Sequence, residues 1–82
     1  MALFRFSITF DGDDRPERSS RCETTEDAIQ EGCNLLMGPV YLLRPATARC
    51  VVRLDGDSAG PAIGVWSYRA GSPVPEWEAA DD

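Results

Sequence analysis

The chain contains neither histidine nor lysine among its 82 residues. Histidine is the usual general base and a common metal ligand, so its absence removes the side chain on which many small active sites depend. The sequence also lacks a phosphate-binding glycine loop, a nucleophile elbow and a dinucleotide-binding fingerprint. We therefore expect a protein that binds rather than catalyses, with no catalytic residue, no metal and no cofactor.

Cysteine is scarce, and no hydrophobic run is long enough to cross a membrane. The three cysteines, Cys22, Cys33 and Cys50, are odd in number and widely spaced, which argues against a disulfide framework and against a CxxC metal or redox site. Cys33 and Cys50 occupy apolar positions expected in the core, whereas Cys22 ends a polar segment and is expected at the surface, open to an intermolecular disulfide. Because Met1 leads directly into a strand-like run, we expect a cytoplasmic protein without a leader.

Acidic residues outnumber basic ones, with 14 Asp and Glu against eight cations, all of them arginine. The formal net charge is -6 and the isoelectric point is near 4.4. Such a domain repels phosphate, so direct nucleic-acid binding is not expected. Hydrophobic residues make up 43% of the chain, which fits a folded domain better than a disordered acidic segment. The expected partner is therefore a basic protein, such as a nucleic-acid-binding complex.

Apolar and polar residues alternate in several segments, which is the pattern of half-buried strands. The expected strands span residues 3–10, 16–23, 47–54 and 62–69. Residues 24–27 predict the start of a helix, because threonine precedes acidic residues of a first turn. Gly38-Pro39 predicts the end of this helix, and residues 40–43 then form either a short strand or a loop.

These elements predict an α+β fold, with an antiparallel β-sheet of four to five strands, one α-helix packed on one face, and the order ββα(β)ββ. Residues 1–72 are expected to form a single domain, and residues 73–82 an extended acidic C-terminal tail. Trp77 lies among prolines and acids of that tail. We expect it either to fold back onto the domain or to belong to a docking peptide.

Two acidic groups follow alternating segments and predict carboxylate-rich turns at strand ends. The first group contains Asp11, Asp13 and Asp14, and the second contains Asp55 and Asp57. If residues 40–43 form a strand, both groups lie at the same end of the sheet and make one negative patch for the arginines or lysines of a partner. If they form a loop, the groups lie at opposite ends. Ordinary turn chemistry is the alternative for each group, and calcium is a further one, although neither group continues into an EF-hand loop.

Trp66 and Tyr68 share one face of the last expected strand. If the helix covers the other face, both rings are exposed beside Arg69 and resemble a protein-binding hot spot. If the helix covers their own face, Trp66 belongs to the core. We include both residues with the five aspartates as candidate partner-binding residues.

In size, acidity, the aspartate groups at 11–14 and 55–57 and the acidic residues at its end, the chain resembles the small phage-encoded anti-CRISPR proteins. Many of these are short, acidic, histidine-poor domains with one or two helices on an antiparallel sheet. The resemblance implies an inhibitor of a CRISPR surveillance complex that acts by steric blockage or as a DNA mimic. Charge-driven binding of this kind predicts an affinity that falls with salt.

Two alternatives stay open beside the inhibitor. Residues 24–29, which open a helix after a strand pair, are similar to the helix start of HicB-type antitoxin domains, and that likeness implies a regulatory module paired with a toxin. The Pro-containing segment expected before that helix is missing here. The third hypothesis is a homodimer or other homo-oligomeric accessory domain, in which the strand at 16–23 or 62–69 pairs across a two-fold axis.

Overall fold

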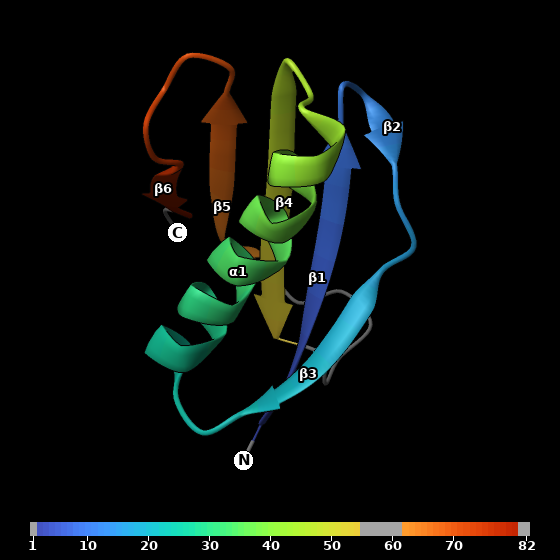
Figure 1. Ribbon diagram of the computed structural model, residues 1–82. Coiled ribbons are helices and arrows are strands. Elements are labelled where there is room, and N and C mark those ends of the chain that lie inside the picture. The colour runs from blue at the N-terminus through green and yellow to red at the C-terminus, as the bar shows by residue number, and fades with distance from the viewer. Residues whose placement is uncertain (1, 55–61, 81–82) are drawn as a thin grey trace.

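One α-helix crosses one face of an antiparallel sheet in the computed structural model of this protein, which describes residues 2–54 and 62–80 (Figure 1). Along the chain the elements are β1 (Ala2–Phe10), β2 (Asp13–Asp14), β3 (Arg18–Cys22), α1 (Thr25–Leu43), β4 (Thr47–Leu54), β5 (Ala62–Arg69) and β6 (Glu76–Ala79). The predicted α+β class is confirmed, although this part of the chain holds six strands rather than four or five. Residues 13–14 pair as a separate short strand, and residues 76–79 join the sheet.

The strands lie in the order β2-β1-β4-β5-β6. β3 pairs with the first part of β1, along the same edge that pairs with β2 near Phe10. β1 and β4 are therefore the central pair, with Phe4 opposite Leu54 and Phe10 opposite Ala48. β6 forms one edge of the sheet, while β2 and β3 share the other. The predicted strands at 16–23, 47–54 and 62–69 are confirmed, since β3, β4 and β5 fall within or match these segments.

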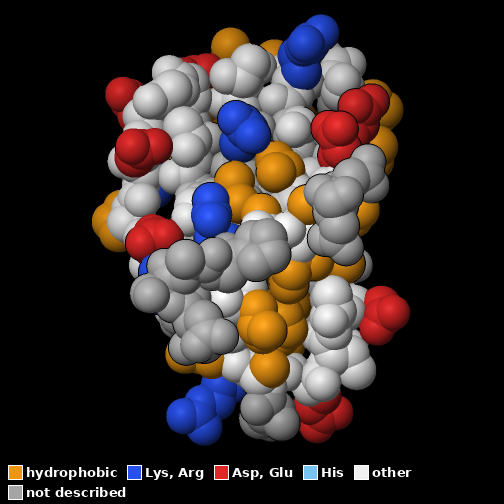
Figure 2. All heavy atoms as spheres, turned by 180° about the vertical axis from the view of Figure 1, so that it is seen from behind, with side chains coloured by type: hydrophobic (Ala, Val, Ile, Leu, Met, Phe, Trp, Pro, Cys, Tyr) orange, Lys and Arg blue, Asp and Glu red, His pale blue; other side chains and the backbone are white. Residues whose placement is uncertain are grey.

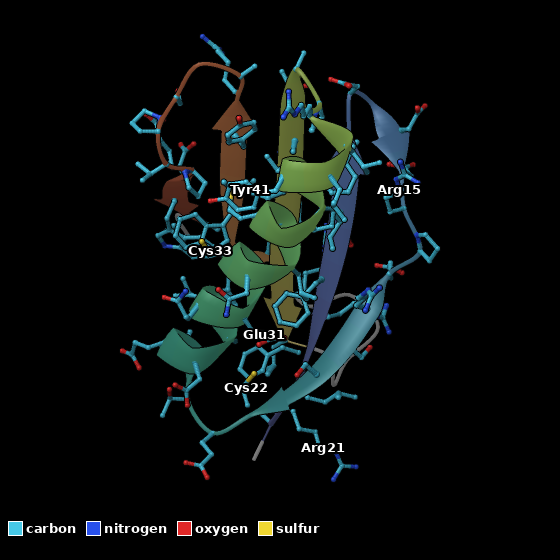
Figure 3. All side chains as sticks on the ribbon, viewed as in Figure 1. Arg15, Arg21, Cys22, Glu31, Cys33 and Tyr41 are labelled. Atoms are coloured by element: carbon cyan, nitrogen blue, oxygen red, sulfur yellow. The ribbon has the colours of Figure 1, made fainter. Side chains whose placement is uncertain are left out.

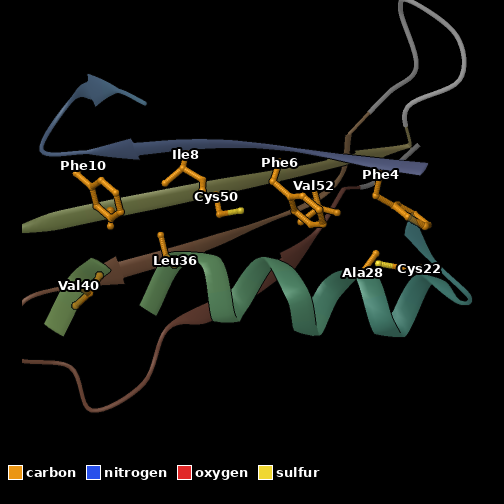
Figure 4. Packing of buried hydrophobic residues seen from close by; sticks show 11 residues of the cluster. Phe4, Phe6, Ile8, Phe10, Cys22, Ala28, Leu36, Val40, Cys50 and Val52 are labelled. Carbon is orange, nitrogen blue, oxygen red and sulfur yellow. The ribbon is translucent and has the colours of Figure 1, made fainter. Parts of the chain in front are cut away.

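The core lies between the sheet and α1, and the alternation along the strands explains it (Figure 4). Every second residue of β1 and β4 points at the helix, and the residues between them point away. The buried apolar residues are Phe4, Phe6, Ile8, Phe10, Cys22, Ala28, Leu36, Val40, Ala48, Cys50 and Val52. Because burying one large apolar side chain contributes about 1.5–3 kcal/mol, this single layer is the main source of stability.

The start of α1 agrees with the prediction. Thr24 adopts an extended conformation as the N-cap, and its Oγ1 accepts a hydrogen bond of 3.1 Å from the backbone N–H of Asp27. Glu26 and Asp27 add negative charge to the first turn, where the helix dipole favours it.

The end of α1 differs from the prediction. The helix continues through Pro39 to Leu43, so residues 40–43 are neither a strand nor a loop. Proline is tolerated because the preceding Gly38 has no Cβ to clash with the ring, although Pro39 has no N–H to donate to the carbonyl oxygen of Leu35. Arg44, at φ 48°, closes the helix by donating its backbone N–H to the carbonyl of Val40 at 2.9 Å.

The segment expected as an acidic tail contains the last strand of the sheet. β6 pairs with β5 so that Trp77 lies opposite Trp66, and the two ring centroids are 5.3 Å apart. Trp77 therefore folds back onto the domain, which is one of the two predicted arrangements. Within the described residues, no helix combines the length and the apolar character that a bilayer crossing requires.

Candidate functional site

The face of the sheet that points away from α1 carries basic side chains in its middle and acidic ones along its margins (Figure 2). Arg49 and Arg53 alternate with the buried residues of β4, so their side chains lie on this open face. One margin, called the β2 margin below, consists of Asp13, Asp14 and Glu17. Asp14 and Glu17 accept hydrogen bonds from Thr9 and Ser7 on the open face, whereas Asp13 lies opposite Phe10 at the same edge. The opposite margin, called the β6 margin, consists of Glu76 and Glu78. The negative charge is therefore divided between two sides of the domain.

Asp11 has a structural task within the first acidic group. Its Oδ1 accepts hydrogen bonds from the backbone N–H groups of Ala46 at 2.8 Å and Thr47 at 3.0 Å. Its own N–H donates to the carbonyl of Thr47 at 2.9 Å. These bonds tie the turn after β1 to the connection between α1 and β4, so this carboxylate is directed at the domain itself.

The described residues place only the first of the two predicted aspartate groups. Asp11 lies at the end of the sheet where Phe10 pairs with Ala48, whereas Leu54, the last described residue before the second group, pairs with Phe4 at the other end. Asp55 and Asp57 themselves lie outside the described residues. Because α1 runs on to residue 43, neither the strand nor the loop considered for residues 40–43 is present, and β4 begins beside Asp11. The single negative patch formed by both groups therefore stays a prediction.

Trp66 and Tyr68 lie on the helix-covered face of β5. They are opposite Cys50 and Ala48, which are both buried, and both rings are partly buried against the core. The Nε1–H of Trp66 donates a hydrogen bond of 2.7 Å to the backbone carbonyl of Ile29. The arrangement that assigned Trp66 to the core side is therefore observed, and neither ring contributes to the open face.

The β6 margin displays its carboxylates in a fixed register. Glu76 and Glu78 are exposed and lie opposite Ser67 and Val65, which flank Trp66 on β5 and point away from the helix. Trp77, between them, points the other way and packs on Trp66. Since successive strand side chains alternate, the two glutamates share one face at a spacing of about 7 Å. The packing of Trp77 thus determines where these two charges stand.

The three cysteines lie in or beside the core, with Cys22 and Cys50 between the sheet and the helix (Figure 4) and Cys33 on the helix (Figure 3). Cys22 is only 8% exposed, so its predicted surface position is wrong, and β3 turns its thiol inward under the first turns of α1. Burial raises the pKa of the Cys50 thiol to about 12, with a smaller contribution from Cys33. Burial also raises the pKa of Cys33. A protonated, covered thiol is a poor nucleophile, so this arrangement favours packing over thiol chemistry.

The role of Asp11 can be tested by stability measurements. Asp11→Ala removes the acceptor for two backbone N–H groups, so we expect it to lower the free energy of unfolding by about 1–3 kcal/mol. Urea denaturation followed by circular dichroism measures this change. Asp13→Ala is the matched control, because Asp13 is exposed directly after the same turn, and its effect should stay within about 0.5 kcal/mol. Equal effects of the two substitutions would contradict the structural role of Asp11.

The alternation of residues 47–54 predicts that Arg49 and Arg53 lie on the face opposite Ala48, Cys50 and Val52, and the structure confirms this placement. The internal use of the Asp11 carboxylate had no local signal, because its partners are more than thirty positions away in the chain. Among residues 2–54 and 62–80, no three His, Cys, Asp or Glu side chains are grouped as metal ligands. In comparisons with known proteins, the chain matches no protein-family model, no curated protein and no solved structure.

Proposed function

We propose that this protein is a non-catalytic inhibitor that binds a basic surface of another protein and keeps nucleic acid away from it. The observation that carries the proposal is the β6 margin, where Glu76 and Glu78 project side by side from an edge strand. Edge position leaves these carboxylates accessible, and the Trp66–Trp77 contact holds them in place. A pre-positioned charge pair loses little conformational freedom on binding, which favours affinity.

The spacing of the two glutamates supports mimicry of a nucleic-acid strand. Side chains two residues apart on a strand lie about 7 Å from each other. Successive phosphates of one DNA strand rise by ~3.4 Å along the helix axis and are also displaced around it, so their direct separation is close to the spacing of the two carboxylates. Arginine side chains that bind phosphates also bind carboxylates, often through two parallel hydrogen bonds from the guanidinium group. A basic groove for DNA would therefore accept this edge.

The overall charge supports the same class of partner. A net charge of -6 attracts a basic surface over a distance and accelerates encounter at low salt. The resemblance to anti-CRISPR proteins points to the same mode of action, with a CRISPR surveillance complex as the partner. The proposal differs from the sequence-based expectation in one respect, since it moves the contact from the aspartate turns to the β6 margin.

Two charge-reversed variants test the proposal. Glu76→Arg with Glu78→Arg alters the β6 margin, and Asp13→Arg with Asp14→Arg makes the same change of net charge at the β2 margin. Wild type and both variants are used as bait in host lysate, and the recovered proteins are quantified by mass spectrometry. We expect wild type to recover a nucleic-acid-binding protein that salt releases, and the β6 variant to lose at least ~10-fold of it.

The Asp13/Asp14 variant is the control and should keep most of the partner. The purified partner must then bind nucleic acid less well when wild-type protein is added, as measured by fluorescence anisotropy. Equal losses for both variants would show that only net charge matters, which contradicts a defined contact at β6. Recovery of a single toxin, or of no partner from a protein that elutes as a defined oligomer, would favour the antitoxin or the homo-oligomer instead.

A further inference from the structure

A second surface lies on the other side of α1, away from β6. Here a groove of about 430 Å³ runs between the C-terminal half of the helix and the chain that links β2 to β3. Leu35, Pro39 and Leu43 form its helix wall, and Phe10 and Pro16 lie on the opposite wall. The three helix residues recur at every fourth position, so they align along one side of the helix.

The continuation of α1 past Pro39 creates this wall. Val40 is the last buried residue of α1, and the helix continues after it to Leu43. The side chains of residues 41–43 are exposed. Leu42 is 86% exposed and Leu43 is 53% exposed. Leu43 lines the groove, and Leu42 adds a second exposed leucine to the same helix end. Exposed apolar surface of this kind commonly marks protein contacts.

The charged side chains that line the groove are both basic. Among the described residues, Arg15 and Arg18 are its only ionisable lining residues, in a protein whose net charge is -6. Arg15 stands over the ring of Phe10 with its Cζ 5.5 Å from the ring centroid, which positions the guanidinium beside the apolar wall (Figure 3). A cation stacked on an aromatic ring is held in place while its edge still donates hydrogen bonds. The groove thus combines an apolar wall with two guanidinium donors for carboxylates, of which Arg15 is oriented by Phe10.

We infer that this groove docks a segment of another protein that presents large apolar side chains flanked by acidic residues. The apolar side chains cover Leu35, Pro39 and Leu43, and the carboxylates pair with Arg15 and Arg18. This surface is separate from the β6 margin and selects the opposite charge, so it goes beyond the proposed inhibition. A protein with both surfaces binds a basic site with one side and an acidic, apolar segment with the other.

A membrane surface is the competing occupant for an apolar patch with arginines. Anionic lipids attract clusters of basic residues, but here only two arginines line the groove and the domain as a whole is acidic. The long-range field of the protein therefore repels an anionic bilayer. An acidic peptide carries far less charge than a bilayer, and its apolar residues gain burial that outweighs this repulsion.

Titration of isotope-labelled protein with two matched peptides tests the inference by nuclear magnetic resonance. Both peptides carry two leucines one helical turn apart, flanked by aspartates in one peptide and by lysines in the other. We expect the aspartate peptide to shift the amide signals of Arg18, Leu35 and Leu43, and to bind at least ~10-fold more tightly than the lysine peptide. Equal binding of both peptides, shifts at other residues, or no binding would overturn the inference.

Two exposed apolar positions provide the variant and its control. Leu43→Asp places a charge on the groove wall and should weaken binding of the aspartate peptide by at least ~10-fold. Val74→Asp makes the same change at a residue that is 63% exposed and lies outside the groove, and it should leave binding unchanged. Sedimentation with vesicles of phosphatidylglycerol completes the test, because vesicle binding that Leu43→Asp abolishes would assign the groove to lipid and overturn the inference.

Discussion

Replacing Phe6 with alanine is expected to unfold much of the protein at room temperature. Phe6 has no exposed surface and is the largest of the fully buried side chains. Phenylalanine-to-alanine changes in cores cost about 3–5 kcal/mol, because transfer free energy is lost and a cavity remains. Domains in general are stable by only about 5–15 kcal/mol, and small ones lie at the lower end of that range.

Urea denaturation followed by far-ultraviolet circular dichroism measures the loss. Leu3→Ala is the control, since it shortens a side chain on the same strand that is 37% exposed and points to the open face. We expect the control to cost less than about 1.5 kcal/mol, in keeping with its partial exposure. A Phe6→Ala protein as stable as the Leu3→Ala protein would show that the core does not lie between β1 and α1.

A side chain at Gly64 is expected to detach β6 from the sheet. A Cβ built at Gly64 overlaps the ring of Trp77 and stands 2.7 Å from the backbone carbonyl oxygen of Glu78. The backbone oxygen cannot move without β6, so Gly64→Ala displaces the whole strand. Overpacking of this kind usually costs about 1–3 kcal/mol. Because β6 carries Glu76 and Glu78, the substitution should also abolish the salt-sensitive binding proposed for the β6 margin.

A double-mutant cycle separates the two contacts of the added methyl group. Trp77→Ala removes the ring, so Gly64→Ala should cost less in that background by about 0.5–3 kcal/mol. The free energies of unfolding come from urea denaturation, and tryptophan fluorescence reports whether the Trp66–Trp77 contact is lost. Simple additivity of the two substitutions would mean that the ring of Trp77 does not lie over Gly64.

Much of the fold could be predicted from short-range patterns. The alternation in residues 3–10 and 47–54 gave the inward positions of Phe6 and Cys50, because side chains of a strand must alternate between two faces. Thr24 predicted the helix start, since its hydroxyl oxygen accepts a hydrogen bond from a backbone N–H of the first turn. These signals depend on neighbours within a few residues, and the structure confirms each of them.

The remainder depended on distant contacts. Gly38-Pro39 has the composition of a helix end, yet the absence of a Cβ at Gly38 lets α1 continue to Leu43, so the strand or loop predicted for residues 40–43 does not form. The local sequence could not predict which face of β5 is covered by α1, because Trp66 and Tyr68 on one face and Ile63 and Val65 on the other are all apolar or aromatic. The hydrogen bond from Trp66 to the carbonyl of Ile29 belongs to the observed choice, and it joins a strand to a helix far away in the chain.

The central position of β1 also has a consequence for how quickly the chain folds. β1 finds β3 a few residues downstream, but its other neighbour, β4, follows only after the whole helix. Closing so long a loop before any contact forms slows folding, so we expect rates typical of sheet-rich domains, in the range of about milliseconds to seconds. We expect β3 to pair with β1 first, because it is the nearer strand in the chain, which leaves the opposite edge of β1 for β4.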